Sequence, residues 1–207
     1  MRRLLRDGFL LLLLAIPAAA QSGDELWQSL IEGNRAYVGG TVTFDHLADL
    51  RQHSADHQNP PVTILSCSDS RVPPELIFNR SLDQLFVIRV AGNIAGTFEL
   101  ASIEYAIANG YTKLIVVLGH ENCGAVKAAI AGGDAPTPSL EALLQRIRRS
   151  FHAKPATVRA AVEANAHASA DHLLANSKVI REAVRSGKVG LVAAYYNLTS
   201  GVVERIR

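Results

Sequence analysis

Four short apolar runs, rich in β-branched residues, limit most tightly what this chain can fold into. They occupy residues 62–66, 85–90, 113–118 and 189–195. Runs of this length and composition are typical of strands buried on both faces of a parallel sheet. Between them, helical spacing of apolar residues predicts helices at 98–109, 125–130, 140–150 and 158–186. This alternation predicts an α/β fold with a mainly parallel central β-sheet flanked by helices.

The rest of the chain adds elements at both ends of this core. Residues 25–38 have amphipathic helical spacing, and Gly39 and Gly40 end the predicted helix. Residues 41–61 are polar and are expected to be irregular, whereas 202–206 are expected to form a short last strand. With 207 residues in all, we expect residues 21–207 to form a single domain.

The overall charge argues against nucleic acid as a partner. The chain is 48% hydrophobic and 19% charged, which is ordinary for a globular protein, and its formal net charge is only +2. No basic cluster alternates with aromatic residues in the sequence. The sequence therefore predicts no nucleic-acid binding.

The first twenty residues have the pattern of a signal peptide. Three arginines precede an apolar run at 9–16, and the small residues Ala18, Ala19 and Ala20 follow it. We expect cleavage after Ala20 and export to the periplasm. The alternative is an uncleaved anchor, although the apolar run is short for a bilayer. Cleavage would remove three arginines and one aspartate and bring the formal charge to zero, so no membrane binding is expected of the mature form.

The only two cysteines lie at predicted strand ends. Cys67 follows the first strand, and His120 and Cys123 follow the third. Ligands of parallel sheets bind at the carboxyl ends of strands. Two thiolates and one imidazole suit Zn²⁺, and a three-ligand shell leaves a fourth position for water. A disulfide between the cysteines is the alternative in an oxidising compartment, but it leaves His120 unexplained.

A carboxylate and a guanidinium follow the first cysteine closely. Asp69 and Arg71 are spaced to form a bidentate pair that orients the carboxylate. Asp69 then either accepts a hydrogen bond from a zinc-bound hydroxide or itself ligates zinc and blocks the open position. Capping of the helix expected after Pro73 is a third reading of Asp69. Gly124 lets the backbone approach a small ligand.

These motifs together resemble the β-class carbonic anhydrases. The resemblance rests on residues 67–73 and on His120, Cys123 and Gly124. It extends to supporting segments at 33–35, 86–93, 102–106 and 196–201. It implies the fold of that family, one Zn²⁺ on Cys67, His120 and Cys123, and a catalytic Asp69–Arg71 dyad. The implied reaction is reversible hydration of CO₂ to bicarbonate and a proton by attack of zinc-bound hydroxide.

The resemblance also implies a substrate pocket. Gln58 matches a glutamine that hydrogen-bonds substrate, and Phe86 and Tyr105 match residues of the apolar CO₂ pocket. Ala91 stands where larger aliphatics often occur, and the amide of Gly124 would stabilise bicarbonate. Plain core packing is the alternative for Phe86 and Tyr105.

A second bicarbonate site, known in one subgroup, is not expected here. That site needs a tryptophan at position 64, where this chain has Ile64, together with an arginine matching Arg89. The resemblance further implies a homodimer or a dimer of dimers, with Trp27 of the first helix buried in the interface. The alternatives left open are a hydrolase of CS₂ or COS on the same scaffold, a non-catalytic zinc protein and a disulfide-bonded binding protein.

Overall fold

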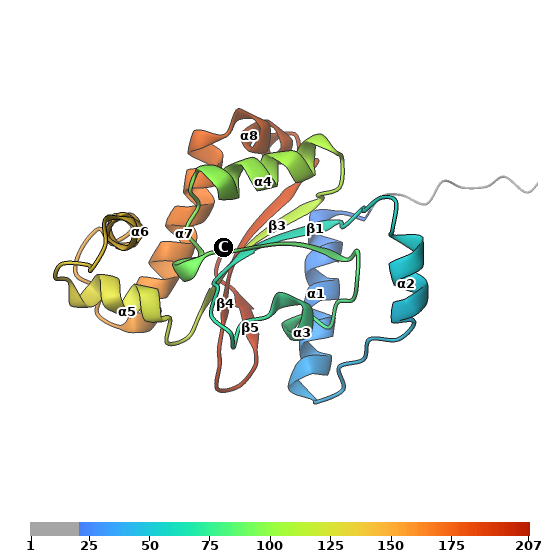
Figure 1. The fold of residues 1–207 in the computed structure, drawn as a ribbon, viewed down its shortest axis with the longest axis horizontal. Helices are drawn as coiled ribbons and strands as arrows, with labels where there is room; N and C mark the ends of the chain where they lie inside the picture. Colours follow the sequence, from blue (N-terminus) through green and yellow to red (C-terminus); the bar gives the residue numbers. More distant parts are fainter. Residues whose placement is uncertain (1–20) are drawn as a thin grey trace, which may run out of the picture.

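A computed structural model describes residues 21–207 and shows one five-stranded sheet between two layers of helices (Figure 1). The predicted signal peptide and its cleavage site at Ala20 lie outside the described residues. The strand order is β2-β1-β3-β4-β5, and all neighbours are parallel except β4 and β5. The strands are β1 (Val62–Ser66), β2 (Leu85–Arg89), β3 (Leu114–His120), β4 (Gly190–Tyr196) and β5 (Val203–Arg205). The predicted α/β class with a mainly parallel sheet is confirmed.

Helices cover both faces of this sheet. The long helices are α1 (Gly23–Val38), α4 (Thr97–Ala108), α5 (Gly124–Ala131), α6 (Pro138–Arg148), α7 (Val158–Asn176) and α8 (Lys178–Arg185). The shorter ones are α2 (Leu47–His53), α3 (Pro74–Ile77) and a 3₁₀ turn, η1 (Ala91–Asn93). No helix within residues 21–207 is both long enough and apolar enough to cross a bilayer.

The side chains of the buried strand β3 contribute to two of the three clusters that make up the core. Because side chains alternate along a strand, Leu114 and Val116 pack on one face, and Ile115 and Val117 pack on the other. The first face is covered by α1 and α3, and the second by α4, α7 and α8. This burial on both faces explains why the strand sequence is continuously apolar.

Helix α1 is fixed to its own chain. Ser22 and Glu25 form a capping box at its start. A Cβ on Gly33 would lie 1.9 Å from the carbonyl oxygen of Phe78, so only glycine allows α1 to pack this closely on α3. Trp27 on this helix is only 4% exposed and belongs to the core of its own chain. The expectation that Trp27 would be buried in an interface is therefore wrong.

Three segments differ from the sequence prediction. The polar stretch 41–61 contains α2, whose residues include no buried side chain to give an apolar pattern. The predicted helix 158–186 is interrupted at Ser177, which ends α7 and caps α8 by accepting the Ile180 N–H. Strand β3 continues to His120, two residues beyond the predicted end. This extension places His120 on the strand itself.

Candidate active site

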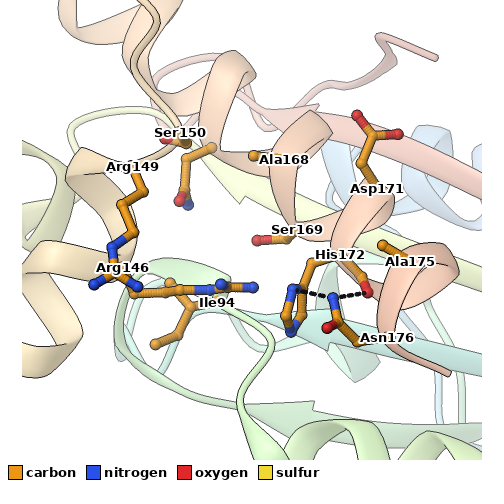
Figure 2. A pocket seen from close by; sticks show the side chains of 11 residues that line it. Ile94, Arg146, Arg149, Ser150, Ala168, Ser169, Asp171, His172, Ala175 and Asn176 are labelled. Atoms are coloured by element: carbon orange, nitrogen blue, oxygen red, sulfur yellow. Dashed lines mark hydrogen bonds between the residues drawn. The ribbon is translucent and has the colours of Figure 1, made fainter.

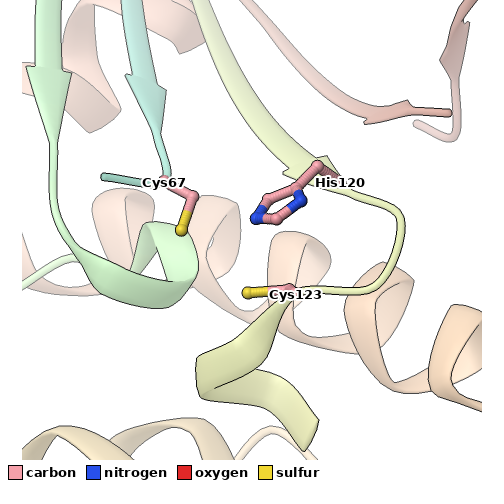
Figure 3. Close-up of side chains that lie close together, drawn as sticks. All are labelled: Cys67, His120 and Cys123. Carbon is pink, nitrogen blue, oxygen red and sulfur yellow. The ribbon is translucent and has the colours of Figure 1, made fainter. Parts of the chain in front are cut away.

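Three side chains that could together hold a metal ion converge at the carboxyl edge of the sheet (Figure 3). Cys67 follows β1, His120 ends β3, and Cys123 precedes α5. Their ligand atoms all lie within 4.8 Å of one another, and the residues are 5%, 0% and 1% exposed. Strands β1 and β3 are parallel neighbours paired Ser66 to Leu118, so their ends necessarily meet. Both cysteines are free, and the disulfide alternative finds no support.

The turn between β3 and α5 directs Cys123 back toward His120. Asn122 adopts a left-handed conformation, with φ of 54°, which sharpens the turn. Glu121 anchors it: its N–H donates to the carbonyl of Tyr196 at 2.8 Å, and its carboxylate accepts the N–H and hydroxyl of Thr199. The segment after β4 therefore holds the metal-binding turn in place.

His120 is oriented for ligation. Its Nδ1 lies 2.9 Å from the carbonyl oxygen of Glu121, which only accepts, so Nδ1 carries the proton. Nε2 is then left with a lone pair. This nitrogen is buried and has no hydrogen-bond partner among residues 21–207. A buried, unpartnered lone pair beside two sulfur atoms fits a soft-ligated zinc ion well.

The pKa values of the two cysteine thiols are shifted in opposite directions. The hydrogen bonds from Cys123 and from the backbone N–H of Gly92 lower the pKa of Cys67 to about 4, although burial opposes this. The neighbouring Cys67 and burial both raise the pKa of Cys123. The metal-free site at neutral pH therefore holds one thiolate and one thiol, and metal binding has to displace the second proton.

Asp69 and Arg71 form the predicted bidentate pair. The Nε and Nη2 atoms of Arg71 donate to the two carboxylate oxygens at 2.9 and 2.7 Å, and its backbone N–H also donates to Asp69. These bonds hold the pKa of Asp69 well below its usual range. One carboxylate oxygen of Asp69 lies 3.9 Å from Nε2 of His120. An ionised acceptor thus stands beside the metal-binding atoms without occupying their centre.

Arg89 and Asn165 support the loops of the site, a role that no sequence pattern indicated. Arg89 donates from Nε to the carbonyl of Cys67 at 2.9 Å and from Nη2 to that of Asp69 at 2.5 Å, which braces the loop carrying both. Asn165, on α7, donates to the carbonyl of Gly92 at 2.6 Å, and the Gly92 N–H in turn donates to Cys67 Sγ at 3.3 Å. No local pattern in α7 marks Asn165, because its partner is 73 residues away.

Comparison with known proteins shows which family the chain belongs to. Residues 62–203 match the carbonic anhydrase family. Carbonic anhydrase 2 of Mycobacterium tuberculosis is 35% identical over 187 residues, covering 84% of this chain and 88% of its own length. The carbonic anhydrase of Mycolicibacterium smegmatis is 31% identical over 186 residues, covering 86% and 90%.

Solved structures agree with this assignment. A Coccomyxa β-carbonic anhydrase in complex with acetazolamide superposes with a TM-score of 0.69, at 26% identity over 86% of this chain and 84% of its own. A tetrameric β-carbonic anhydrase of Sordaria macrospora shares the fold, with a TM-score of 0.69 at 23% identity, covering 87% and 96%. The chain belongs to the β-class carbonic anhydrases.

Within this carbonic anhydrase, the predicted substrate residues fall into two groups. Ala91 begins η1 beside Gly92, and Gly124 begins α5 beside Cys123, so both lie next to the metal ligands. Gln58 precedes β1, at the opposite end from Cys67, and is exposed. Phe86 lies near the start of β2 and stacks on Tyr105, with ring centroids 6.3 Å apart. Gln58, Phe86 and Tyr105 are therefore remote from the candidate metal ligands of their own chain.

Proposed function

We propose that this chain catalyses the zinc-dependent, reversible hydration of CO₂ to bicarbonate and a proton. The observation that supports it most strongly is the free lone pair of His120, which faces two cysteine sulfurs beside an ionised Asp69. Cys67, His120 and Cys123 would hold one Zn²⁺. When bound, the ion supplies a Lewis acid that makes water nucleophilic near neutral pH, the chemistry established for carbonic anhydrases.

The side chains around the metal ligands have separate tasks. Asp69 accepts a hydrogen bond from the attacking oxygen and so turns an oxygen lone pair toward CO₂. Arg71 keeps Asp69 ionised and fixes its orientation through two parallel hydrogen bonds. The new carbon–oxygen bond converts CO₂ and water into bicarbonate, and one proton leaves to solvent. Gly124, the first residue of α5, offers a backbone N–H to a bicarbonate oxygen.

We further propose a homodimer or a dimer of dimers. Gln58, Phe86 and Tyr105 sit far from their own metal ligands, so they can line a CO₂ pocket only at the site of another subunit. The exposure of this region supports that arrangement: Tyr105 is 52% exposed, and Phe98 on the same helix is 82% exposed. Apolar surface of this kind is typical of subunit interfaces.

We also propose that the chain lacks a second bicarbonate site. Ile64 is fully buried in the sheet, where it offers no polar atom. Arg89 already donates to the carbonyls of Cys67 and Asp69, which leaves it braced against its own chain. Asp69 should accordingly stay paired with Arg71 at alkaline pH.

Export to the periplasm remains a proposal from the sequence. It rests on the three early arginines, the apolar run and the alanines before Gln21. Amino-terminal sequencing of protein from the periplasmic fraction would test it. A chain beginning at Gln21 is the expected result, and an intact Met1 would contradict it.

Stopped-flow hydration of CO₂ by the zinc-loaded protein tests the proposed reaction. We expect a rate that rises with pH above neutrality, since thiolate ligands donate charge to the metal and make its water less acidic. Parallel assays would follow release of H₂S from COS and CS₂. H₂S release without CO₂ hydration would contradict the proposal.

A further inference from the structure

A second polar pocket lies between α6 and α7, away from the metal ligands (Figure 2). It has a volume of about 260 Å³. Arg146 and Arg149 approach it from the α6 side, and Ser169 and His172 approach it from α7. The two arginines are three residues apart, a spacing that places them on the same side of a helix. None of these four residues takes part in the proposed reaction.

Neither arginine is neutralised. Within residues 21–207, neither Arg146 nor Arg149 forms an ion pair with a carboxylate. The single hydrogen bond of Arg146 is a long one, 3.4 Å, to the carbonyl of Ala95. Partial burial and the charge of Arg149 both lower the pKa of Arg146, which reflects two like charges held close together. The pocket therefore carries two positive charges and many unused N–H donors.

His172 adds a neutral donor. Asn176 Nδ2 lies 3.1 Å from the carbonyl oxygen of His172, which identifies Nδ2 as a donor, and 2.6 Å from His172 Nδ1. Nδ1 must then accept, so the proton of the neutral ring is on Nε2. Burial and the charge of Arg146 lower the pKa of His172, which favours this neutral form.

The remaining polar groups fit an anion as well. Ser169 is only 5% exposed, and its hydroxyl points into the pocket and forms no hydrogen bond within the described chain. Asp171 is the one acidic residue lining the pocket, and its carboxylate pairs with Arg207. Asn165 lines the inner wall, but its amide is occupied by the carbonyl of Gly92. Donors thus face the hollow from two helices, and the only carboxylate is already neutralised.

We propose that this pocket binds a phosphate dianion, free or as a small phosphomonoester, through Arg146, Arg149, Ser169 and His172. Two uncompensated guanidinium groups match a dianion better than a monoanion, and guanidinium forks suit phosphate oxygens. A neighbouring hollow of about 540 Å³ shares Ile94, Arg146 and His172 and is lined by Leu100 and Leu143. It offers room for the organic part of a phosphomonoester.

Titration calorimetry of the zinc-loaded protein with inorganic phosphate, and separately with glycerol phosphate, tests this. We expect Arg146→Gln to weaken phosphate binding at least about tenfold, because it removes a charge-assisted hydrogen bond. Arg51→Gln on the exposed helix α2 removes the same charge elsewhere and should change the affinity less than about twofold. Tighter binding of glycerol phosphate would identify the monoester as the ligand, and tighter binding of phosphate the free ion.

A second measurement uses the wild-type protein and so does not depend on the folding of a variant. Phosphate added to the wild-type protein should shift the ring nitrogen resonances of His172 and leave those of the exposed His152 unchanged. No phosphate binding to the wild-type protein would overturn the proposal. So would wild-type affinity in Arg146→Gln, because phosphate would then bind elsewhere, such as at the metal.

Discussion

Arg71 holds both carboxylate oxygens of Asp69, through Nε at 2.9 Å and Nη2 at 2.7 Å, and the oxygen bound by Nη2 also lies 3.9 Å from Nε2 of His120. The pair is only partly shielded: the side chain of Asp69 is 17% exposed and that of Arg71 is 55% exposed. The pair therefore serves to orient Asp69 more than to stabilise the fold, since exposed ion pairs contribute little to stability. The arrangement keeps an ionised acceptor aimed at the place where the nucleophile must form.

Asp69→Asn should abolish most of the activity without loss of zinc. The amide cannot replace an ionised acceptor, so we expect kcat/KM for CO₂ hydration to fall about a hundredfold or more. Asp56→Asn, in an exposed loop, is the matched control and should retain wild-type kinetics. Stopped-flow rates and zinc content measured on the same samples distinguish loss of catalysis from loss of zinc. Unchanged hydration in Asp69→Asn would remove the dyad from the mechanism.

Zinc binding should release about one proton per site at pH 7. Cys67, with a pKa of about 4, is already a thiolate, whereas Cys123 has a raised pKa and enters as a thiol. Zinc affinity should therefore rise with pH around neutrality, and it should fall more steeply below about pH 4, where Cys67 also binds a proton. Calorimetry in buffers of different ionisation enthalpy counts the protons. Release of none would show that both thiols are ionised without the metal.

Gly92 should tolerate a side chain less well than a glycine of the same conformation. Its φ is 73°, and an added Cβ would lie 2.6 Å from Ile147 Cδ1. Gly40, at the end of α1, has a φ of 70° in a Schellman turn and no atom within 4 Å of that position, so Gly40→Ala carries the backbone strain alone. Gly92→Ala should cost about 1–3 kcal/mol more of unfolding free energy. Urea denaturation of both variants measures the difference, and equal losses would contradict the packing argument.

How far the sequence predicts the structure depends on how local each signal is. The strand β1 ends where its apolar run ends, and Cys67, His120 and Cys123 meet because parallel neighbours end at one edge. The Asp69–Arg71 pair is two residues apart and follows from spacing alone. These features depend on contacts along one short stretch or on the general geometry of sheets.

Other features depend on contacts that no local pattern reveals. Asn165 braces Gly92 across 73 residues, and the burial of Trp27 follows from how α1 packs on its own sheet. Gln58 precedes β1, whereas Cys67 follows it, so the two residues lie at opposite ends of that strand. The substrate hydrogen bond implied for Gln58 would therefore have to be made at a site other than that of its own chain. The proposal that this role requires a second subunit therefore rests on the three-dimensional arrangement.

Mixed oligomers test that sharing of residues between subunits. Gln58→Ala and Asp69→Asn should each impair activity in a homo-oligomer. In a hetero-oligomer of the two variants, one site carries both defects and the other carries none, so activity should rise to about half that of the wild type. Differently tagged subunits, coexpressed and purified through both tags, provide the sample. Activity no higher than the mean of the parent variants would place Gln58 outside the neighbour's site.

The most direct test of the whole account is zinc K-edge X-ray absorption on the zinc-loaded protein at pH 8.5. We predict one zinc per chain with two sulfur neighbours at about 2.3 Å, one imidazole nitrogen at about 2.0–2.1 Å and one further light atom from water. That shell would identify Cys67, Cys123 and His120 as the ligands and would show that Asp69 stays paired with Arg71. A shell without sulfur would contradict the metal site, and a carboxylate in place of water would contradict the open position on which the proposed reaction depends.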